Sequence, residues 1–148
     1  MLKEQISASL EDYLEAIYKI IEEKHGVKAI EVSRRLGVGR SSVTEALKTL
    51  ASKKLVNYGR YDVISLTPEG EKAAMKVILK HTILYEFFTD VLGVNPEEAH
   101  ENACRVEHVI SENVLKRFAS FIEFNKNFNS QRNDFKKFFE EMNNEKTV

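Results

Sequence analysis

A tight Gly37-Val38-Gly39 turn between two short helical patterns is the feature that most constrains the fold of this 148-residue chain. The apolar spacing predicts one helix over Lys28 to Leu36, ended by Gly37, and another over Arg40 to Lys53. An earlier helix is predicted over Ser9 to Glu23, with Ser9 as its N-cap. Three helices in this order, with a tight turn between the last two, are typical of a helix-turn-helix.

Two β-prone runs directly follow the third helical pattern. Leu55 to Tyr58 and Asp62 to Leu66 lie on either side of a Gly59-Arg60 turn, which predicts a hairpin. A hairpin at this place would be the wing of a winged helix-turn-helix. Thr67-Pro68 then has the residue types of an N-cap and a first helical residue, so a further helix is expected to begin there.

The second half of the chain is predicted to be helical. The helix that begins at Pro68 is expected to end near Gly93, and Pro96 is expected to open another that reaches about Phe124. Asn125 to Asn133 is asparagine-rich and predicts a loop, before an amphipathic helix over Asp134 to Met142. We therefore predict a mostly α protein, with a winged helix-turn-helix domain over residues 1–72 and a helical second domain over residues 73–148.

Charge is distributed unevenly along the chain. Between Lys28 and Arg60 eight basic residues face only two acidic ones, a net charge of +6, although the whole chain has a net charge of −1. The composition, 43% hydrophobic and 30% charged, is too apolar for a disordered protein. No apolar run approaches the roughly 20 residues of a membrane span, and no secretory signal precedes the first helix. A cytoplasmic protein without a membrane partner is expected.

The third helix is expected to read DNA, because the corresponding helix of a helix-turn-helix enters the major groove with its N-terminal residues toward the base edges. Arginine and lysine pair with guanine or phosphate, and small hydroxyl side chains allow close approach. The candidate DNA contacts are Arg40, Ser41, Ser42, Thr44, Glu45 and Lys48 on this helix and Arg60 in the wing. Two alternatives stay open: Ser41 and Ser42 could only cap the helix, and a winged helix can also dock proteins.

Four potential metal ligands share one stripe of the helix predicted after Pro96. At about 100° per residue, the stripe spans roughly 80°, and a packing stripe lies about 120° away. The ligand stripe comprises His100, Cys104, Glu107 and His108, and the packing stripe comprises Ala103, Val106, Ile110 and Val114. Imidazole, thiolate and carboxylate at i, i+3 and i+4 can converge on one transition-metal ion.

Further candidate ligands occur on two other predicted helices. His81 interrupts the apolar stripe of the helix that begins at Pro68, where a histidine alone is more often a buried structural residue. Asp12 and Glu15 lie on the polar face of the first helix, where carboxylates alone are usually solvated. Combined with the ligand stripe, these side chains could complete a metal site that joins the two domains.

The chain resembles the diphtheria-toxin-repressor family of iron- and manganese-dependent regulators over nearly its whole length. The matching segments are LEDYLEAIY, EVSRRLGVGRSSVTEALKTL, LTPEG, LKH and ACRVEHVIS. The resemblance implies that Cys104, Glu107 and His108 are primary ligands and that His81 and His100 belong to an ancillary site. It also implies dimerisation through the second domain and binding of a palindromic DNA operator.

The resemblance is mixed between the iron and manganese branches of that family. Cys104 matches the cysteine of the iron branch, whereas Asp12 and Glu15 match carboxylate ligands of the manganese branch. Tyr85 stands where the iron branch has an ancillary carboxylate, and the third domain of longer members has no counterpart here. A thiolate favours Fe(II), Co(II), Ni(II) or Zn(II) over Mn(II), and cellular availability then favours Fe(II). Fe(II) is therefore the expected activator, with Mn(II) next and Co(II), Ni(II) or Zn(II) as substitutes.

The leading hypothesis is a homodimeric, metal-activated repressor of metal-uptake genes that binds double-stranded DNA and has no small-molecule substrate. One alternative keeps the winged helix but makes Cys104 a redox or drug sensor without a metal; the only cysteine of the chain cannot form an intrachain disulfide. A small metalloenzyme is the alternative from another class. HExxH, paired ExxH motifs and a nucleophile elbow do not occur in the sequence, so an enzyme is not expected.

Overall fold

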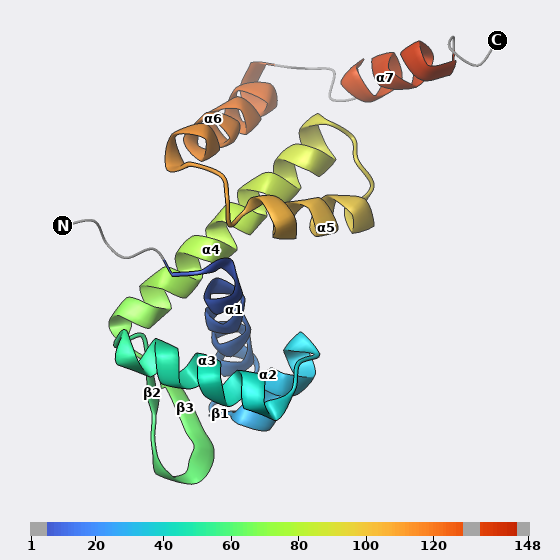
Figure 1. Cartoon of the computed structure of the whole chain (residues 1–148). Coiled ribbons are helices and arrows are strands. Elements are labelled where there is room, and N and C mark those ends of the chain that lie inside the picture. Colours follow the sequence, from blue (N-terminus) through green and yellow to red (C-terminus); the bar gives the residue numbers. More distant parts are fainter. Residues whose placement is uncertain (1–5, 129–133, 145–148) are drawn as a thin grey trace. The chain divides into compact units, whose positions relative to one another are not determined.

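The computed structural model describes residues 6–128 and 134–144 of the chain (Figure 1). Two compact units are present, Met1–Ile78 and Leu79–Val148. The protein is mostly helical, as predicted, with a single small sheet among the described residues. Within the described part of the chain, every helix is too short or too polar to cross a membrane.

The first unit is a winged helix-turn-helix. Its helices are α1 (Ala8–Glu23), α2 (Ala29–Leu36) and α3 (Arg40–Ser52). Gly37 ends α2 in the left-handed region at φ 65°, a conformation that favours glycine, and so allows the tight turn into α3. The N-cap of α1 is Ser7, not the predicted Ser9: the Ser7 side chain accepts a hydrogen bond from the backbone N–H of Leu10.

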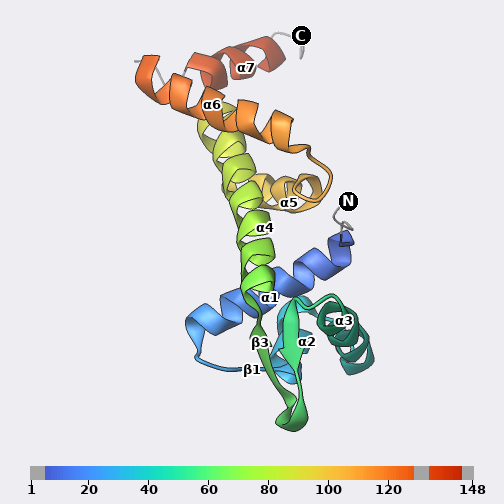
Figure 2. The same ribbon diagram turned by 90° about the vertical axis from the view of Figure 1, so that its left-hand side faces the viewer.

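The wing is a hairpin of β2 (Val56–Tyr58) and β3 (Val63–Leu66), joined through the 3-10 turn η1 (Arg60–Asp62). It extends away from the helices of this unit (Figure 2). A short strand that the sequence analysis missed, β1 (Val27–Lys28), pairs antiparallel with β3 and gives the sheet order β1-β3-β2. With two residues, β1 is too short to show an alternating pattern of apolar and polar side chains.

The helices of the first unit pack on this sheet around one apolar core. The core includes side chains from α1, α2, α3 and all three strands, so no element of the unit could bury its apolar face alone. Its fully buried members include Leu14, Ile17, Val27, Val32, Val43, Leu47, Leu50 and Ile64. The apolar face of the third helix, formed by Val43, Ala46, Leu47 and Leu50, is buried in this core.

Helix α4 (Pro68–Glu86) begins directly after the wing, as predicted. The Thr67 hydroxyl accepts a hydrogen bond from the N–H of Gly70 at 3.0 Å and donates to the carbonyl of Lys54 at 2.7 Å. At Gly70 the start of α4 touches the backbone of Leu55 so closely that a Cβ would lie 1.8 Å from the Leu55 carbonyl oxygen. The helix was expected to reach Gly93, but its last turn is the π-helical segment η2 (Phe87–Val91).

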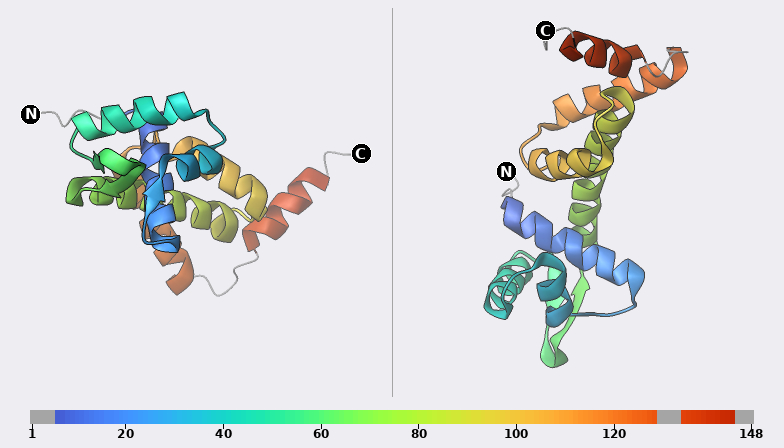
Figure 3. Two further views of the ribbon diagram at one scale, coloured as in Figure 1. Left: turned by 90° about the horizontal axis from the view of Figure 1, so that it is seen from below. Right: turned by 90° about the vertical axis from the view of Figure 1, so that its right-hand side faces the viewer.

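The second unit contains the C-terminal part of α4 with η2, α5 (Pro96–Val106), α6 (Glu112–Phe128) and α7 (Asp134–Asn144). Helices α5 and α6 lie against the C-terminal half of α4 and η2 (Figure 3). Buried Leu84, Ala103 and Leu115 form the centre of its core. The loop expected over Asn125 to Asn133 is wrong at its start, because α6 continues to Phe128; residues 129–133 lie outside the described residues.

The single helix predicted from Pro96 to Phe124 is two helices. Helix α5 ends at Val106, and α6 starts anew at Glu112. Ser111 explains the break, because its hydroxyl accepts a hydrogen bond from the N–H of Val114 at 3.3 Å. Serine favours such a cap over a place inside a helix. One consequence is that Val114 does not continue the packing stripe and is 42% exposed, whereas Ala103, Val106 and Ile110 do pack in the core.

Candidate metal centre and DNA-binding surface

Helix α5 carries two of the candidate ligands, the exposed His100 and the half-buried Cys104, beside its buried face. It starts at Pro96 behind the N-cap Asn95, whose side chain accepts from the N–H of Glu98 at 2.9 Å. Ala99 and Ala103 are fully buried and fix which face of α5 meets the core. Because His100 and Cys104 each follow one of these alanines, both project from the side of the helix that borders the core.

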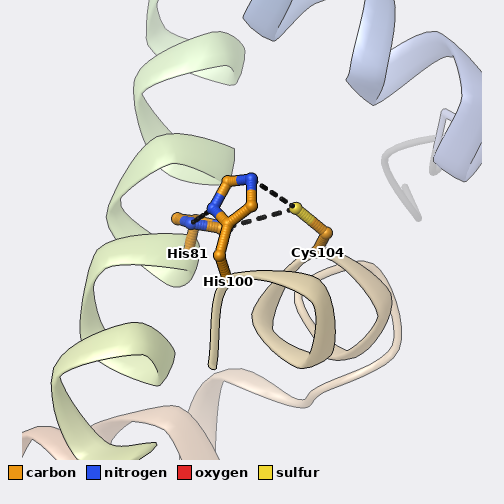
Figure 4. Close-up of side chains that lie close together, drawn as sticks. All are labelled: His81, His100 and Cys104. Carbon is orange, nitrogen blue, oxygen red and sulfur yellow. Dashed lines mark hydrogen bonds between the residues drawn. The ribbon is translucent and has the colours of Figure 1, made fainter. Parts of the chain in front are cut away.

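His81 of α4 meets this side of α5. Its Nε2 atom lies 3.1 Å from Nδ1 of His100, and its Nδ1 atom lies 3.8 Å from Sγ of Cys104. The Cys104 sulfur is also 3.8 Å from Nε2 of His100. Figure 4 shows the three side chains directed toward one another. One ligand atom from each lies within 4.8 Å of the other two, so the three can share one metal ion.

A carboxylate joins the cluster from behind His81. Oε2 of Glu107 lies 2.7 Å from Nδ1 of His81, and Oε1 lies 3.4 Å from Nε2 of His108. Glu107 is 1% exposed and is the buried charged residue of the described part of the chain. A carboxylate is buried in this way only where partners offset its lost hydration, and here imidazole rings are those partners.

Glu107 and His108 lie beyond the last residue of α5, which differs from the continuous stripe that the sequence predicted. Glu107 is the C-cap, but its backbone stays helical at φ −55° and ψ −30°. The helical phase therefore extends to Glu107, and His108 lies in the following turn. All five candidates from this unit still form one connected cluster, because each contacts another within 3.8 Å.

Tyr85 occupies the position one helical turn after His81 on α4. Its ring stacks on the His81 ring, with centroids 6.3 Å apart and an interplanar angle of 14°. It therefore buttresses the histidine from one side and offers no carboxylate to this cluster.

The donor types of this cluster fit a divalent transition metal. Three imidazoles, one thiol and one buried carboxylate are the ligands of borderline and softer ions such as Fe(II), Co(II) and Zn(II), whereas calcium and magnesium prefer oxygen ligands alone.

Asp12 and Glu15, the carboxylates expected from the first helix, belong to the first unit. Asp12 is exposed on α1, in agreement with its predicted place on the polar face. Glu15 is half-buried and accepts a 2.5 Å ion-pair contact from Lys19 one turn later. Their assignment as ligands stays a prediction.

The predicted DNA-reading face is the exposed side of α3. Its candidates alternate with the buried Val43, Ala46, Leu47 and Leu50, so the same helix that packs in the core presents a polar surface. Of these candidates, only Thr44 is half-buried, and it donates to the carbonyl of Arg40 at 3.0 Å. The exposed ones are Arg40, Ser41, Ser42, Glu45 and Lys48, and Arg60 of the wing is exposed as well.

The N-cap of α3 bears on whether Ser41 and Ser42 cap this helix. Gly39 is the cap residue, so Ser41 and Ser42 lie inside the helix and cap nothing there. Their hydroxyls are thus presented to solvent on the predicted reading face. Lys48 lies 3.8 Å from Glu45, and both side chains are well exposed. Such an exposed ion pair is weak, so both side chains remain available to contact DNA.

Two ion pairs lower the net positive charge around α2. The Arg35 guanidinium contacts both carboxylate oxygens of Glu23, at 3.0 and 2.7 Å. Arg35 holds the pKa of Glu23 below its usual value, chiefly through this hydrogen bond. Lys24 and the backbone N–H of Lys28 lower the pKa of Glu31 in the same way. Arg35 and Lys24 are therefore paired with carboxylates of the first unit.

The sequence analysis missed the burial of Glu107 and its contact with His81. A charged residue between two helices gives no sign of burial in the sequence, and helical spacing cannot show which atoms of two helices meet. The nearest available signal was the His-Cys-Glu-His spacing after Pro96, which identified the residues but not their contacts.

Two descriptions of known protein families match the chain. Residues 5–63 match the family described as iron dependent repressor, N-terminal DNA binding domain. Residues 67–133, which contain the whole His81-to-His108 cluster, match the family described as iron dependent repressor, metal binding and dimerisation domain.

Individual relatives agree with this match. An uncharacterized HTH-type transcriptional regulator of Methanocaldococcus jannaschii is 38% identical over 119 residues, which cover 80% of this chain and 95% of the relative. The HTH-type transcriptional regulator MntR of Oceanobacillus iheyensis is 32% identical over 133 residues, 90% of each chain.

A solved structure described as a manganese-dependent transcriptional repressor in complex with manganese aligns with a TM-score of 0.71 and 29% identity. The alignment covers 78% of this chain and 53% of that one, so this chain spans about half the length of the solved relative. The resemblance to the diphtheria-toxin-repressor family is therefore confirmed: the chain belongs to the iron-dependent repressor family of metal-dependent, DNA-binding transcriptional regulators.

Proposed function

We propose that this protein is a cytoplasmic, homodimeric repressor of metal-uptake genes whose DNA binding is activated by Fe(II). The observation that carries the choice of metal is the thiol of Cys104, 3.8 Å from an imidazole nitrogen of His81 and of His100. A thiolate in a nitrogen-rich donor set favours Fe(II), Co(II), Ni(II) or Zn(II) over Mn(II), and cellular availability favours Fe(II) among these.

Mn(II) is the second candidate, and a specific observation favours it. Solved structures described as a manganese-dependent transcriptional repressor in complex with manganese and as the manganese regulator SloR are both similar to this chain. Asp12 and Glu15 match carboxylate ligands of the manganese branch, and oxygen ligands suit Mn(II). We include both residues with His81, His100, Cys104, Glu107 and His108 in the proposed ligand set.

The roles of the remaining residues follow from their places in the winged helix. A bound ion supplies a crosslink between side chains of separate helices. Arg40 and Lys48 supply positive charge to DNA, and Ser41, Ser42 and Thr44 allow close approach to the base edges. Glu45 can accept from cytosine, and Arg60 reaches the phosphates from the wing. In a homodimer, two such helices would read half-sites of a palindrome about one DNA turn, roughly 34 Å, apart.

A DNA-selection assay with each candidate metal and with a chelator tests the metal switch. Metal should raise specific DNA affinity by about 5- to 150-fold, and DNA should raise metal affinity by the same factor, because linkage between two sites is reciprocal. The selected sequence then provides the operator for affinity measurements at one fixed salt concentration. Equal affinity with Fe(II) and with chelator would refute the metal switch and favour a sensor that uses Cys104 without a metal.

The Cys104→Glu variant tests the choice between iron and manganese. Replacing the thiol by an oxygen ligand should shift activation of operator binding from Fe(II) toward Mn(II). The fold should survive, because Cys104 is half-buried and lies outside the core of the second unit. Asn102→Glu, which adds the same charge at an exposed position of α5, is the matched control and should keep the original metal preference.

A further inference from the structure

The tip of the wing presents an aromatic residue that contributes little to the fold. Tyr61 lies in the turn η1 between β2 and β3, in the hairpin that extends away from the helices of the first unit (Figure 2). It is 90% exposed, more than any other large hydrophobic residue in the described part of the chain. The packing of the first unit therefore does not explain why an aromatic residue stands at this position.

The backbone of Tyr61 has a conformation that suits glycine or asparagine better. Its φ of 76° and ψ of 19° lie in the left-handed region, where a Cβ comes close to the following carbonyl oxygen. Hairpin turns that need a residue in this region usually have glycine or asparagine there. Gly59, two residues earlier, has a φ of −135° and does not use the freedom of glycine. The tyrosine therefore costs this turn some stability.

A second residue of the first unit has a positive φ, and its conformation is explained by the fold. Lys54, with φ 59°, donates its backbone N–H to the carbonyl of Ala51 at 3.0 Å. Its own carbonyl accepts from the Thr67 hydroxyl at 2.7 Å, so this backbone holds the start of α4. The strained position at the wing tip has an exposed side chain instead. A strained and exposed residue of this kind indicates a function outside the folded unit.

We propose that Tyr61 enters the minor groove of DNA beside the half-site that α3 reads and positions the wing there. Strand β2 packs against α3, so a helix in the major groove brings the wing to the adjoining minor groove. That groove is about 6 Å wide, too narrow for a helix but open to one side chain from a turn. The inference rests on the DNA binding of the proposed function and is independent of which metal activates it.

The chemistry of Tyr61 and Arg60 fits a minor groove that is rich in A·T pairs. These pairs present only acceptors there, and the tyrosine hydroxyl is a donor. The ring supplies apolar surface to the deoxyribose edges of the groove. Arg60, the exposed neighbour of Tyr61, adds the positive charge that a narrow A·T groove attracts. A G·C pair places the N2 amino group of guanine in the same groove and would obstruct the ring.

The Tyr61→Gly variant tests the inference, because it should change folding stability and DNA binding in opposite directions. The urea midpoint should rise, since glycine occupies the left-handed region without strain. Affinity for the operator from the DNA-selection assay, measured in the metal condition of its selection, should fall about 10-fold, as expected for an aromatic side chain that DNA half-buries. Val63→Ala, which trims an exposed apolar residue of the same hairpin outside the turn, is the matched control and should keep the wild-type affinity.

Three operators that differ only in the pairs beside the half-site test which groove is contacted. These pairs are A·T, inosine·C or G·C. Inosine lacks the N2 amino group of guanine, so an inosine·C pair has the minor-groove surface of A·T and the major-groove surface of G·C. The wild-type protein should bind the A·T and inosine·C operators equally and the G·C operator more weakly. Tyr61→Gly should bind all three equally.

Unchanged operator affinity in Tyr61→Gly would overturn the proposal and would indicate a partner other than DNA for the exposed ring. A urea midpoint that falls together with the affinity, or an equal loss of affinity in Val63→Ala, would also overturn it, because the residue would then act through the stability of the hairpin. Equal wild-type affinity for all three operators would exclude the minor groove. The metal switch fails on a different result, equal operator affinity with Fe(II) and with chelator.

Discussion

His81 and Glu107, 26 positions apart in the sequence, are joined by a 2.7 Å contact between Nδ1 of the imidazole and Oε2 of the carboxylate. The carboxylate is almost fully buried, whereas His81 keeps its other ring nitrogen directed toward His100. The contact therefore connects α4 to the end of α5 and orients a candidate metal ligand. This relationship makes Glu107 the most informative residue of the cluster to substitute.

We predict that Glu107→Ala lowers Co(II) or Fe(II) affinity by at least about 10- to 100-fold, because loss of a carboxylate that orients a ligating histidine alone has effects of this size and Glu107 is also in the proposed ligand set. Glu107→Gln should lose less, since the amide oxygen can still accept from Nδ1 of His81. Competition with a chromophoric chelator measures both affinities. Glu101→Gln, an exposed position of α5, is the control, and equal losses in it and in Glu107→Ala would contradict a specific role for Glu107.

Arg40→Gln should weaken operator binding without changing metal affinity, because Arg40 lies at the start of α3 in the first unit. If the contact is to a phosphate, the dependence of log affinity on log salt concentration should decrease by about one unit. Fluorescence anisotropy at several salt concentrations measures the slope. Lys72→Gln on α4 removes the same charge outside α3 and the wing, and a loss there as large as in Arg40→Gln would place the reading surface elsewhere.

Gly70→Ala should destabilise the first unit by about 3 kcal/mol, because its Cβ would lie 1.8 Å from the Leu55 carbonyl oxygen and the backbone must move. Gly59→Ala is the control: nothing lies within 4 Å of a Cβ there, and its φ of −135° is accessible to alanine. Urea unfolding followed by circular dichroism measures the midpoint of each variant. A midpoint of Gly70→Ala equal to that of Gly59→Ala would show that α4 can shift at no cost.

The ion pairs of Glu23 and Glu31 should make the first unit less stable in acid. Both carboxyl groups have pKa values below the ordinary value of 4.5, because Arg35 and Lys24 hydrogen-bond their charged forms. A lowered pKa in the folded state contributes stability above pH 4.5 that is lost as the pH falls through the folded-state pKa.

The combined variant Glu23→Gln and Glu31→Gln should therefore show a flatter dependence of unfolding free energy on pH below 5 than the wild-type protein. Urea unfolding at a series of pH values checks this, with Glu101→Gln as a control outside both pairs. A slope as steep as that of the wild type would mean that other carboxyl groups govern the acid sensitivity.

The sequence by itself was sufficient for the features that depend on local chemistry. Gly37 determines where the second helix ends, and Thr67-Pro68 determines where the fourth begins. The apolar period of the third helix determines which of its faces packs in the core. Each of these signals acts within a few residues. The spacing of His100 and Cys104 on one helix is local in the same sense. These features led to the winged helix and to the second-unit residues of the candidate metal centre.

Tertiary structure decided what depends on contacts between distant segments. Strand β1 exists only because Val27 and Lys28 meet β3, and no pattern in two residues could reveal it. The apolar periodicity predicted one continuous helix, but Ser111 caps the start of a second helix there. Apolar spacing does not show whether a serine side chain caps a helix or lies inside one. The partners of Cys104 and the burial of Glu107 also depend on the tertiary structure. Helical phase shows which side chains share a face of one helix, but it does not show which atoms of another helix come close to them.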